Sequence, residues 1–487
     1  MISIAEYAPD RSIFDAATTD NLVNVLPHVN SWGPFPAFVP FTEATPERPQ
    51  GSHLAYVKNG QYLQFCGTKS GLYVLNPGTL AWDNVSKAGG YSTADTIRWS
   101  FADYGSWVIA ANGIDPIQFI DISGVIGTFA DLAADAPIPR HVSVVGDFVV
   151  GMNLTTDEKT VQWSGLNQPT FWTPRQRSSD FQPFPDGGEI MGSCGFEKGA
   201  VIFQEKCIRE MTLALDTPLV ATFTKTVDAH GAVAPQSIVS TGNGIFYLAL
   251  DGFYRYGNPP TPIGVERVDQ TFLDDIALSE LYQVFGSADP VRKIVYWAYR
   301  SKGNPYEYSY DKVLCYHYGI DKWSLLQPGT IMTGLVRATT PGYTLDSLTA
   351  LGYTLDELPY SLDSRAWAAG APTLAAFSTD YEMGFFSGTP LQATMGTAAV
   401  ELATGKRTFV SGWRPLCDAG AIQGRVGIRD RAGSTTSWKP TYSVNRTGLI
   451  PARASGRFHR FEITINAGQT WNHCHGVEPT GKAEGQQ

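Results

Sequence analysis

The sequence predicts an all-β protein: a six-bladed β-propeller with an extended N-terminal arm before it and a β-sandwich or barrel-like domain after it. A strand–turn–strand pattern returns about every 45 residues, and the 487 residues include 49 glycines and 31 prolines. Aromatic residues make up a further 12% of the chain. Because strands favour aromatic residues and tight turns favour glycine and proline, this composition indicates many short strands and few long helices.

The repeat is clearest in residues 60–76, where a short apolar strand, a Gly/Ser turn and a second strand with an aromatic residue follow one another. The equivalent points of six copies, separated by steps of 45, 41, 53, 44 and 49 residues, are Leu63, Val108, Val149, Ile202, Phe246 and Val295. A four-stranded blade with its turns uses about 40–50 residues. Six copies therefore predict six blades.

Changes in composition divide the chain into four predicted segments: a proline-rich arm over 1–50, the propeller over 51–337, a short-turn connector over 338–371 and a C-terminal β domain over 372–487. Proline disfavours regular structure, so the arm is expected to run extended over its own domain or a neighbouring subunit. Only Phe14–Val25 has the pattern of a helical turn or two. The polar tail from Pro479 onwards is expected to be disordered.

Two of these segments have recognisable internal patterns. The connector contains three short Leu-Asp turns aligned on Asp346, Asp356 and Asp363, with too few clustered carboxylates for calcium loops. The C-terminal domain contains seven stretches with strand-like composition, which predict a sandwich or barrel. These stretches are 373–377, 381–386, 392–402, 407–414, 425–429, 437–442 and 458–465.

The formal net charge of −10 argues against a protein that grips nucleic acid by its phosphates, which requires basic patches. It is compatible with a surface along which DNA slides. The six cysteines are scattered and predict free thiols in a reducing compartment. The acidic first ten residues lack the apolar core of a secretory signal, and no apolar run is long enough for a membrane helix. We therefore expect no membrane insertion.

The motif search predicts no catalytic residue, no cofactor-binding residue and no metal site. The sequence contains no Gly-x-Ser-x-Gly, no phosphate-binding glycine loop and no repeated glycosidase or WD signature. His473-Cys474-His475 is the one group with ligand-like residue types, and a packed or solvated strand end explains it better than a metal site. The acid pair Asp274-Asp275 is expected to be a loop feature rather than a glycosidase pair.

Four large aromatic residues recur just after the aromatic strand of a repeat, where the next strand should pack on its neighbour. They are Trp82, Phe129, Trp172 and Trp323. We expect them to fill the core between blades, and the alternative is a row of ligand-binding aromatic residues.

Taken in order, the arm, blades and C-terminal domain resemble the tail hub or nozzle proteins of short-tailed bacteriophages, which include packaged-DNA stabilisation proteins and lower tail tubular proteins. The resemblance spans most of the chain as loose patterns of aromatic and turn residues. The segments that carry it are Tyr7–Asp10, Asn24–Pro27, Trp32–Pro36, Trp99–Pro116, Phe171–Pro174 with Gly187-Gly188, Ser455–Phe461 and Ala467–Trp471.

This resemblance implies a structural virion protein of the tail that is assembled in the host bacterial cytoplasm and is not an enzyme. Such proteins form a homohexameric ring below the portal and its adaptor, and they meet tail fibre, spike or needle proteins. The ring retains the packaged genome and later lets viral DNA pass without specific binding. Which residues line that channel is unknown from the sequence.

Two other functions remain open at this stage. One is a carbohydrate-binding or depolymerising tail propeller, which would need exposed aromatic residues and carboxylates at one face of the blades. The other is a cellular scaffold propeller that binds peptides, whose repeats usually have stronger signatures than these.

Overall fold

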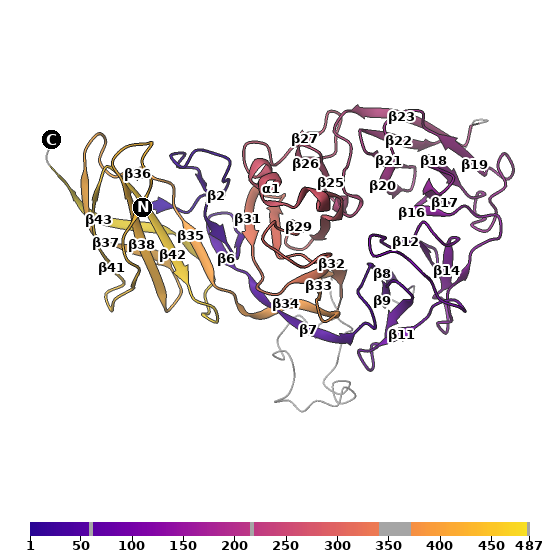
Figure 1. Cartoon of the computed structure of the whole chain (residues 1–487), viewed down its shortest axis with the longest axis horizontal. Helices are drawn as coiled ribbons and strands as arrows, with labels where there is room; N and C mark the ends of the chain where they lie inside the picture. The colour runs from indigo at the N-terminus through magenta and orange to yellow at the C-terminus, as the bar shows by residue number, and fades with distance from the viewer. Residues whose placement is uncertain (58–61, 215–218, 340–371, 485–487) are drawn as a thin grey trace.

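The computed structural model describes residues 1–57, 62–214, 219–339 and 372–484, and it confirms the prediction of an all-β chain. Figure 1 shows sheets arranged around a centre, with the C-terminal strands gathered at one end of the molecule. Within the described residues there is one α-helix, α1 (Asp269–Asp275). Two 3-10 turns, η1 (Pro235–Ser237) and η2 (Leu278–Gln283), complete the helical structure of that part of the chain.

Five four-stranded antiparallel sheets follow one another along the chain, each built from consecutive strands. The first two contain β8 (Gly51–Tyr56), β9 (Tyr62–Gly67), β10 (Leu72–Leu75) and β11 (Trp82–Asn84), then β12 (Ser100–Tyr104), β13 (Trp107–Ala111), β14 (Gln118–Asp121) and β15 (Ala130–Asp131). The third contains β16 (Pro139–Val145), β17 (Phe148–Leu154), β18 (Asp157–Trp163) and β19 (Asp180–Pro183). The fourth and fifth contain β20 (Ile190–Phe196), β21 (Gly199–Gln204), β22 (Cys207–Leu213) and β23 (Ala221–Asp228), then β24 (Val239–Thr241), β25 (Gly244–Ala249), β26 (Gly252–Arg255) and β27 (Thr261–Pro262).

Two further four-stranded units follow. The sixth contains β28 (Phe285–Asp289), β29 (Ile294–Tyr299), β30 (Lys312–His317) and β31 (Lys322–Leu326), and it continues into a longer sheet. The seventh contains β32 (Met332–Ala338), β33 (Thr373–Ser378) and β34 (Glu382–Pro390), with β7 (Pro36–Ala44) as its fourth strand. The first six units take all their strands from one stretch of chain, whereas the seventh takes one from the N-terminal segment.

The six predicted repeat points fall on β9, β13, β17, β21, β25 and β29, the second strand of each of the first six units. The period is therefore confirmed, but the described residues contain seven four-stranded units instead of the expected six. Residues 340–371, which lie outside the described residues, separate β32 from β33 in the sequence. Because the last strand of that unit also comes from the distant β7, no local repeat marks it.

Hydrophobic clusters fill the interfaces between consecutive units, and one of them also joins the last unit to the first. Phe65 of the first unit packs with Val108 of the second, for example, and Tyr296 of the sixth with Ala376 of the seventh. The last interface joins the seventh unit to the first, where the rings of Phe377 and Trp82 lie 5.8 Å apart. The seven units are thus linked in a ring. Its innermost contacts include the first-strand pairs β8–β12, β12–β16, β16–β20, β24–β28, β28–β32 and β32–β8.

The N-terminal arm packs on its own chain, which was one of the two expectations for it. Its short strands are β1 (Ile2–Ser3), β2 (Glu6–Tyr7), β3 (Thr18–Thr19), β4 (Leu22–Val23), β5 (Val25–Pro27) and β6 (Trp32–Pro34). The expected helical turn in Phe14–Val25 is wrong. Strand β4 pairs instead with β31 on one side and β35 on the other, so tertiary pairing overrides the local preference.

The C-terminal strands form two sheets that share one core. The strands are β35 (Ala393–Gly396), β36 (Val400–Glu401), β37 (Thr408–Cys417), β38 (Ile422–Arg429), β39 (Ser437–Trp438), β40 (Tyr442–Ser443), β41 (Ile450–Gly456), β42 (Phe458–Ile465) and β43 (Cys474–Ala483). One sheet has the order β41-β37-β43-β6-β5 with β1 beside β43, and the other runs from β31 through β4 and β35 to β42 and β38. Trp413 of the first sheet packs against Phe461 of the second, with their ring centroids 5.5 Å apart.

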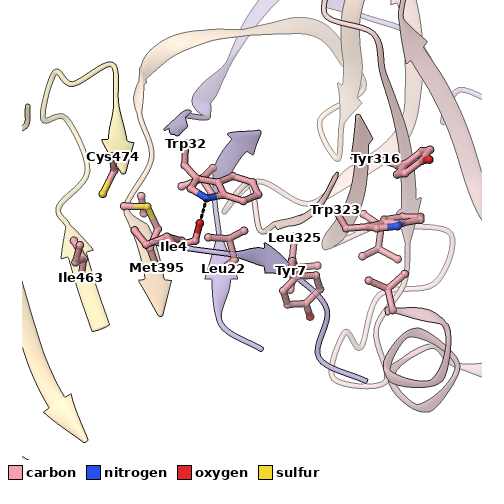
Figure 2. Packing of buried hydrophobic residues seen from close by; sticks show 14 of the residues in the cluster. Ile4, Tyr7, Leu22, Trp32, Tyr316, Trp323, Leu325, Met395, Ile463 and Cys474 are labelled. Atoms are coloured by element: carbon pink, nitrogen blue, oxygen red, sulfur yellow. Dashed lines mark hydrogen bonds between the residues drawn. The ribbon is translucent and has the colours of Figure 1, made fainter. Parts of the chain in front are cut away.

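The arm lies between the ring and the C-terminal strands and joins their cores. Figure 2 shows Leu22 and Trp32 between Trp323 of the ring and Met395 of the C-terminal region. The indole nitrogen of Trp32, which is 1% exposed, donates a hydrogen bond of 3.0 Å to the carbonyl oxygen of Ile4. One continuous hydrophobic cluster therefore connects the fifth and sixth units to the C-terminal sheets.

Sheet pairing crosses the predicted segment boundaries. The predicted boundaries place β33 and β34 in the C-terminal domain and β7 in the arm, yet all three pair in the sheet of β32. The tail expected to be disordered from Pro479 continues β43 as far as Ala483, where Lys482 lies opposite Phe409. The three aspartate turns of the connector lie outside the described residues. All six cysteines are free thiols, as predicted.

Candidate functional site

A cavity of about 340 Å³ lies where the starts of the first strands of five consecutive units converge. Its walls come from the second to the sixth unit, so residues far apart in sequence meet there. They are Thr96, Ile97 and Arg98 before β12, Arg140 and His141 in β16, Asn153 in β17, Glu189 and Met191 at the start of β20, Pro235 and Gln236 in η1, and Tyr282 and Gln283 in η2. A cavity of this size is typical of a small-molecule site.

Cationic side chains outnumber anionic ones in the cavity wall. Glu189 is the one carboxylate among the lining residues, and its Oε2 lies 3.5 Å from the guanidinium of Arg140 and accepts a 3.2 Å hydrogen bond from Asn153. Arg98 donates to the hydroxyl of Tyr310 at 3.1 Å, and that hydroxyl donates to the backbone oxygen of Gln283 at 2.8 Å. The charge of Arg98 therefore has a neutral partner that fixes its position.

A third arginine, Arg48, lies near Arg98 and just before the first strand of the first unit. The guanidinium of Arg48 stacks on the ring of Tyr308 at 4.6 Å. Burial lowers the pKa of Arg48, and the nearby positive charge of Arg98 lowers it further. Arg48, Arg98 and Arg140 thus mark the starts of three neighbouring first strands, and Asp95 and Glu189 pair with Arg48 and Arg140 at 3.8 Å and 3.5 Å.

Two buried side chains of the cavity carry polar atoms without a hydrogen-bond partner among the described residues: His141 Nε2 and Gln283 Oε1. His141 is 9% exposed and Gln283 is 6% exposed. Burial, with a smaller contribution from Arg140, lowers the pKa of His141 to about 3, so its ring is neutral at pH 7. Unsatisfied buried polar groups cost free energy, and a bound molecule is one way to satisfy them.

This arrangement is suited to binding. Its described lining residues supply guanidinium, imidazole, amide, carboxylate and hydroxyl groups, all of which form hydrogen bonds. The chain matches no protein family model and no curated protein. None of the helices in the described part of the chain has the length and apolar character that a membrane crossing requires.

In the His473-Cys474-His475 group, His473 immediately precedes β43 and the other two residues begin it, and both imidazoles are hydrogen-bonded to the arm. His473 Nδ1 lies 2.9 Å from the hydroxyl of Ser31, and His475 Nδ1 lies 3.1 Å from the carbonyl oxygen of Asn30. No group of three or more His, Cys, Asp or Glu side chains placed to hold a metal ion occurs among the described residues. The geometry gives this cluster a role in attaching the arm.

Asp275 of the acid pair and the four aromatic residues take part in the packing and hydrogen bonding of the fold. Asp275 accepts hydrogen bonds from Tyr299 at 2.9 Å and from Lys312 at 2.7 Å, while Asp274 is exposed in α1. The four aromatic residues expected between blades lie in the clusters between units, which confirms that expectation. They are Trp82, Phe129, Trp172 and Trp323.

Sequence reasoning missed the cavity because five units contribute to it and no single stretch contains a motif. A positional signal was nevertheless present. Arg98, Arg140 and Gln236 stand 10, 9 and 10 residues before the repeat points Val108, Val149 and Phe246. Polar residues at one repeat position of a ring-shaped fold converge in space, and that rule would have found them.

Proposed function

We propose that this protein is the hub or nozzle of a short-tailed bacteriophage tail, a structural virion protein that surrounds the path of the DNA. In this proposal the seven units are the blades of a β-propeller and the two C-terminal sheets are a β-sandwich. The observation that carries the proposal is that strands of the N-terminal arm pair with both regions. Strand β7 completes the seventh unit, and β4 joins the ring to the C-terminal sheets.

A propeller accounts for the sheet order and for the hydrophobic interfaces between consecutive units. Radial closure leaves few exposed strand edges, and completion of the last blade by an N-terminal strand holds the ring together. Rigid construction of this kind suits a wall that must withstand the pressure of packaged DNA. The arm provides the second connection, because Asp20 forms an ion pair with Arg460 and Glu6 forms one with Arg267.

The charge of the chain supports passage of DNA without adhesion. A net charge of −10 keeps the surface as a whole from attracting phosphates. In the proposed assembly six copies form a homohexameric ring below the portal and adaptor, through a heterologous interface that closes by rotation. Tail fibre, spike or needle proteins would then attach to this ring in the virion.

The test is the mass of the assembly. The purified 53.0 kDa chain would be measured by native mass spectrometry alone, with the portal, and with the portal–adaptor complex of the same phage. We expect six copies per complex when the adaptor is present and none when the portal stands alone. A chain that stays monomeric beside an intact portal–adaptor complex would overturn the proposal.

The central cavity favours a second candidate, a carbohydrate-binding or depolymerising tail propeller. The cavity combines the exposed aromatic ring of Tyr282 with the carboxylate of Glu189. A depolymerase would release reducing ends from a host surface polysaccharide, and Glu189→Gln would abolish that release. The exposed Glu307→Gln is the matched control. A wild-type protein that releases no reducing ends would eliminate cleavage as the function.

A further inference from the structure

The central cavity has features that the proposed hub function does not require, and they indicate a ligand. Two lining residues each carry a buried polar atom that lacks a partner among the described residues, His141 Nε2 and Gln283 Oε1, and both atoms are turned away from the open space of the cavity. The side chains of both residues are more than nine-tenths buried, so bulk water does not readily replace a partner. The cavity of about 340 Å³ is large enough to admit a small molecule.

The charge of the wall indicates the sign of that ligand. Arg98 and Arg140 both line the cavity, and Glu189 neutralises only one of them because it lies beside Arg140. Arg48 lies next to Arg98 but is paired with Asp95 at 3.8 Å, so the excess positive charge at the cavity comes from Arg98. Guanidinium groups bind carboxylate and phosphate oxygens with two parallel hydrogen bonds, which makes them the preferred side chains for such groups.

The other lining residues indicate the chemistry of the uncharged part of the ligand. Ile97, Met191 and Pro235 offer apolar surface, and Tyr282 presents an aromatic ring that is 41% exposed. Gln283 Oε1 accepts a hydrogen bond, and the neutral imidazole of His141 either donates or accepts one. A carbon skeleton with several hydroxyl groups satisfies both kinds of surface at once.

We propose that the central cavity binds a small hydroxylated organic anion, a sugar acid or a sugar phosphate, through its anionic group on Arg98 and Arg140. Its hydroxyl groups bond to Gln283 Oε1 and His141 Nε2 once these side chains turn toward the cavity. This proposal is independent of the hub function, because the cavity lies within one chain and needs no neighbouring subunit.

Isothermal titration calorimetry of the purified full chain at pH 7 tests the ligand class. The probes are glucuronate for a sugar acid and glucose 6-phosphate for a sugar phosphate, with glucose and inorganic phosphate as controls. We expect at least one anionic sugar to bind with a Kd below about 10 mM and at least about tenfold more tightly than either control. The better probe decides between carboxylate and phosphate.

Two variants test the site. Arg140→Gln removes one guanidinium from a side chain that is 44% exposed, so the core is undisturbed. Gln283→Glu replaces the acceptor by an anion of the same size. Each should weaken binding of the better probe at least about tenfold, because a charged hydrogen bond is lost or a like charge is introduced. The matched control is the exposed Arg446→Gln, which should bind like wild type.

The melting temperature of each variant is measured in parallel to confirm that it folds, and if Gln283→Glu does not fold, Arg140→Gln alone decides. Three outcomes overturn the proposal: neither anionic sugar binds below about 10 mM, glucose or bare phosphate binds as tightly as the anionic sugars, or the folded cavity variants bind like Arg446→Gln.

Discussion

Val39 in β7 lies directly opposite Phe385 in β34, although one residue belongs to the start of the chain and the other to its last quarter. Strand β7 is the outer strand of the seventh unit, so the N-terminal segment completes the ring. Phe385 is 5% exposed and its ring lies 5.3 Å from that of Phe41 in β7. The pairing of these two strands therefore closes the ring.

Phe385→Ala should lower the free energy of unfolding by about 3–5 kcal/mol, because it removes a buried aromatic ring from the interface between the seventh and first units. Urea unfolding followed by tryptophan fluorescence measures the change. The control is Phe196→Ala, whose side chain is 48% exposed and whose effect should stay below about 0.5 kcal/mol. Equal effects of the two substitutions would show that β7 does not hold the ring closed.

Asp20→Asn should destabilise the attachment of the arm to the C-terminal region by about 3 kcal/mol. The guanidinium of Arg460 is nearly buried and pairs with Asp20, so the substitution leaves a buried cation without its counter-charge. Asp430→Asn is the matched control, because its pair with Arg407 is exposed and contributes less than about 1 kcal/mol. Chemical denaturation of both variants gives the comparison, and a control variant as unstable as Asp20→Asn would contradict the role of the buried pair.

Asp269 should make stability depend on pH between about 4 and 7. It is 5% exposed, and burial raises the pKa of its carboxyl from 3.8 to about 7, although the N–H of Phe253 donates to it at 3.1 Å. In this window the folded chain keeps a proton that the unfolded chain has lost. The contribution of Asp269 to the free energy of unfolding therefore falls as pH rises and levels off above pH 7.

The stability of Asp269→Asn relative to wild type should consequently rise by about 1.4 kcal/mol per pH unit across this range, since asparagine does not titrate. Urea unfolding at pH 4.5, 5.5 and 6.5 measures this slope. In the exposed control Asp274→Asn the difference from wild type should not change with pH. A pH-independent difference for Asp269→Asn would contradict the raised pKa.

Cys417 should be the thiol that an alkylating reagent modifies first in the folded protein. It is half-buried, and a hydrogen bond with Cys474 lowers its pKa. Cys194 is also half-buried, but burial raises its pKa to about 12, so about one thiol in ten thousand is ionised at pH 8.

Peptide mapping after brief treatment with iodoacetamide at pH 8 checks this order. Cys417→Ser should remove the early label, and Cys194→Ser should leave it in place. Early labelling of Cys194 in the wild-type chain would contradict the assignment.

The sequence predicts those features of the fold that depend on neighbouring residues. The repeat points Leu63 to Val295 mark second strands correctly because each of these units folds from one stretch and buries its own apolar strand. The seventh unit was missed because its pairing of Val39 with Phe385 is non-local. The short β4 was missed for a similar reason: two residues have no period, and only the strands on either side define it.

The candidate site was the least predictable part of the molecule. Arg98, Arg140 and Gln283 come from three different units, and their convergence depends on how the units are placed around the centre. Burial is also invisible in the sequence, so the unpartnered atoms of His141 and Gln283 could not be recognised. The packed aromatic residues, by contrast, were predictable because Trp172 and Trp323 both follow the aromatic strand of a repeat.

The position of β7 also dictates an order of events during synthesis. Translation produces β7 before all other strands of the ring, but its partner β34 ends only at Pro390. Six units therefore leave the ribosome before the ring has its final strand pair, and the long sequence separation makes that pairing slow. Until then the pairing edge of β7 is open to strands of other chains. The step that protects a nascent chain from aggregation is thus one of the last to occur.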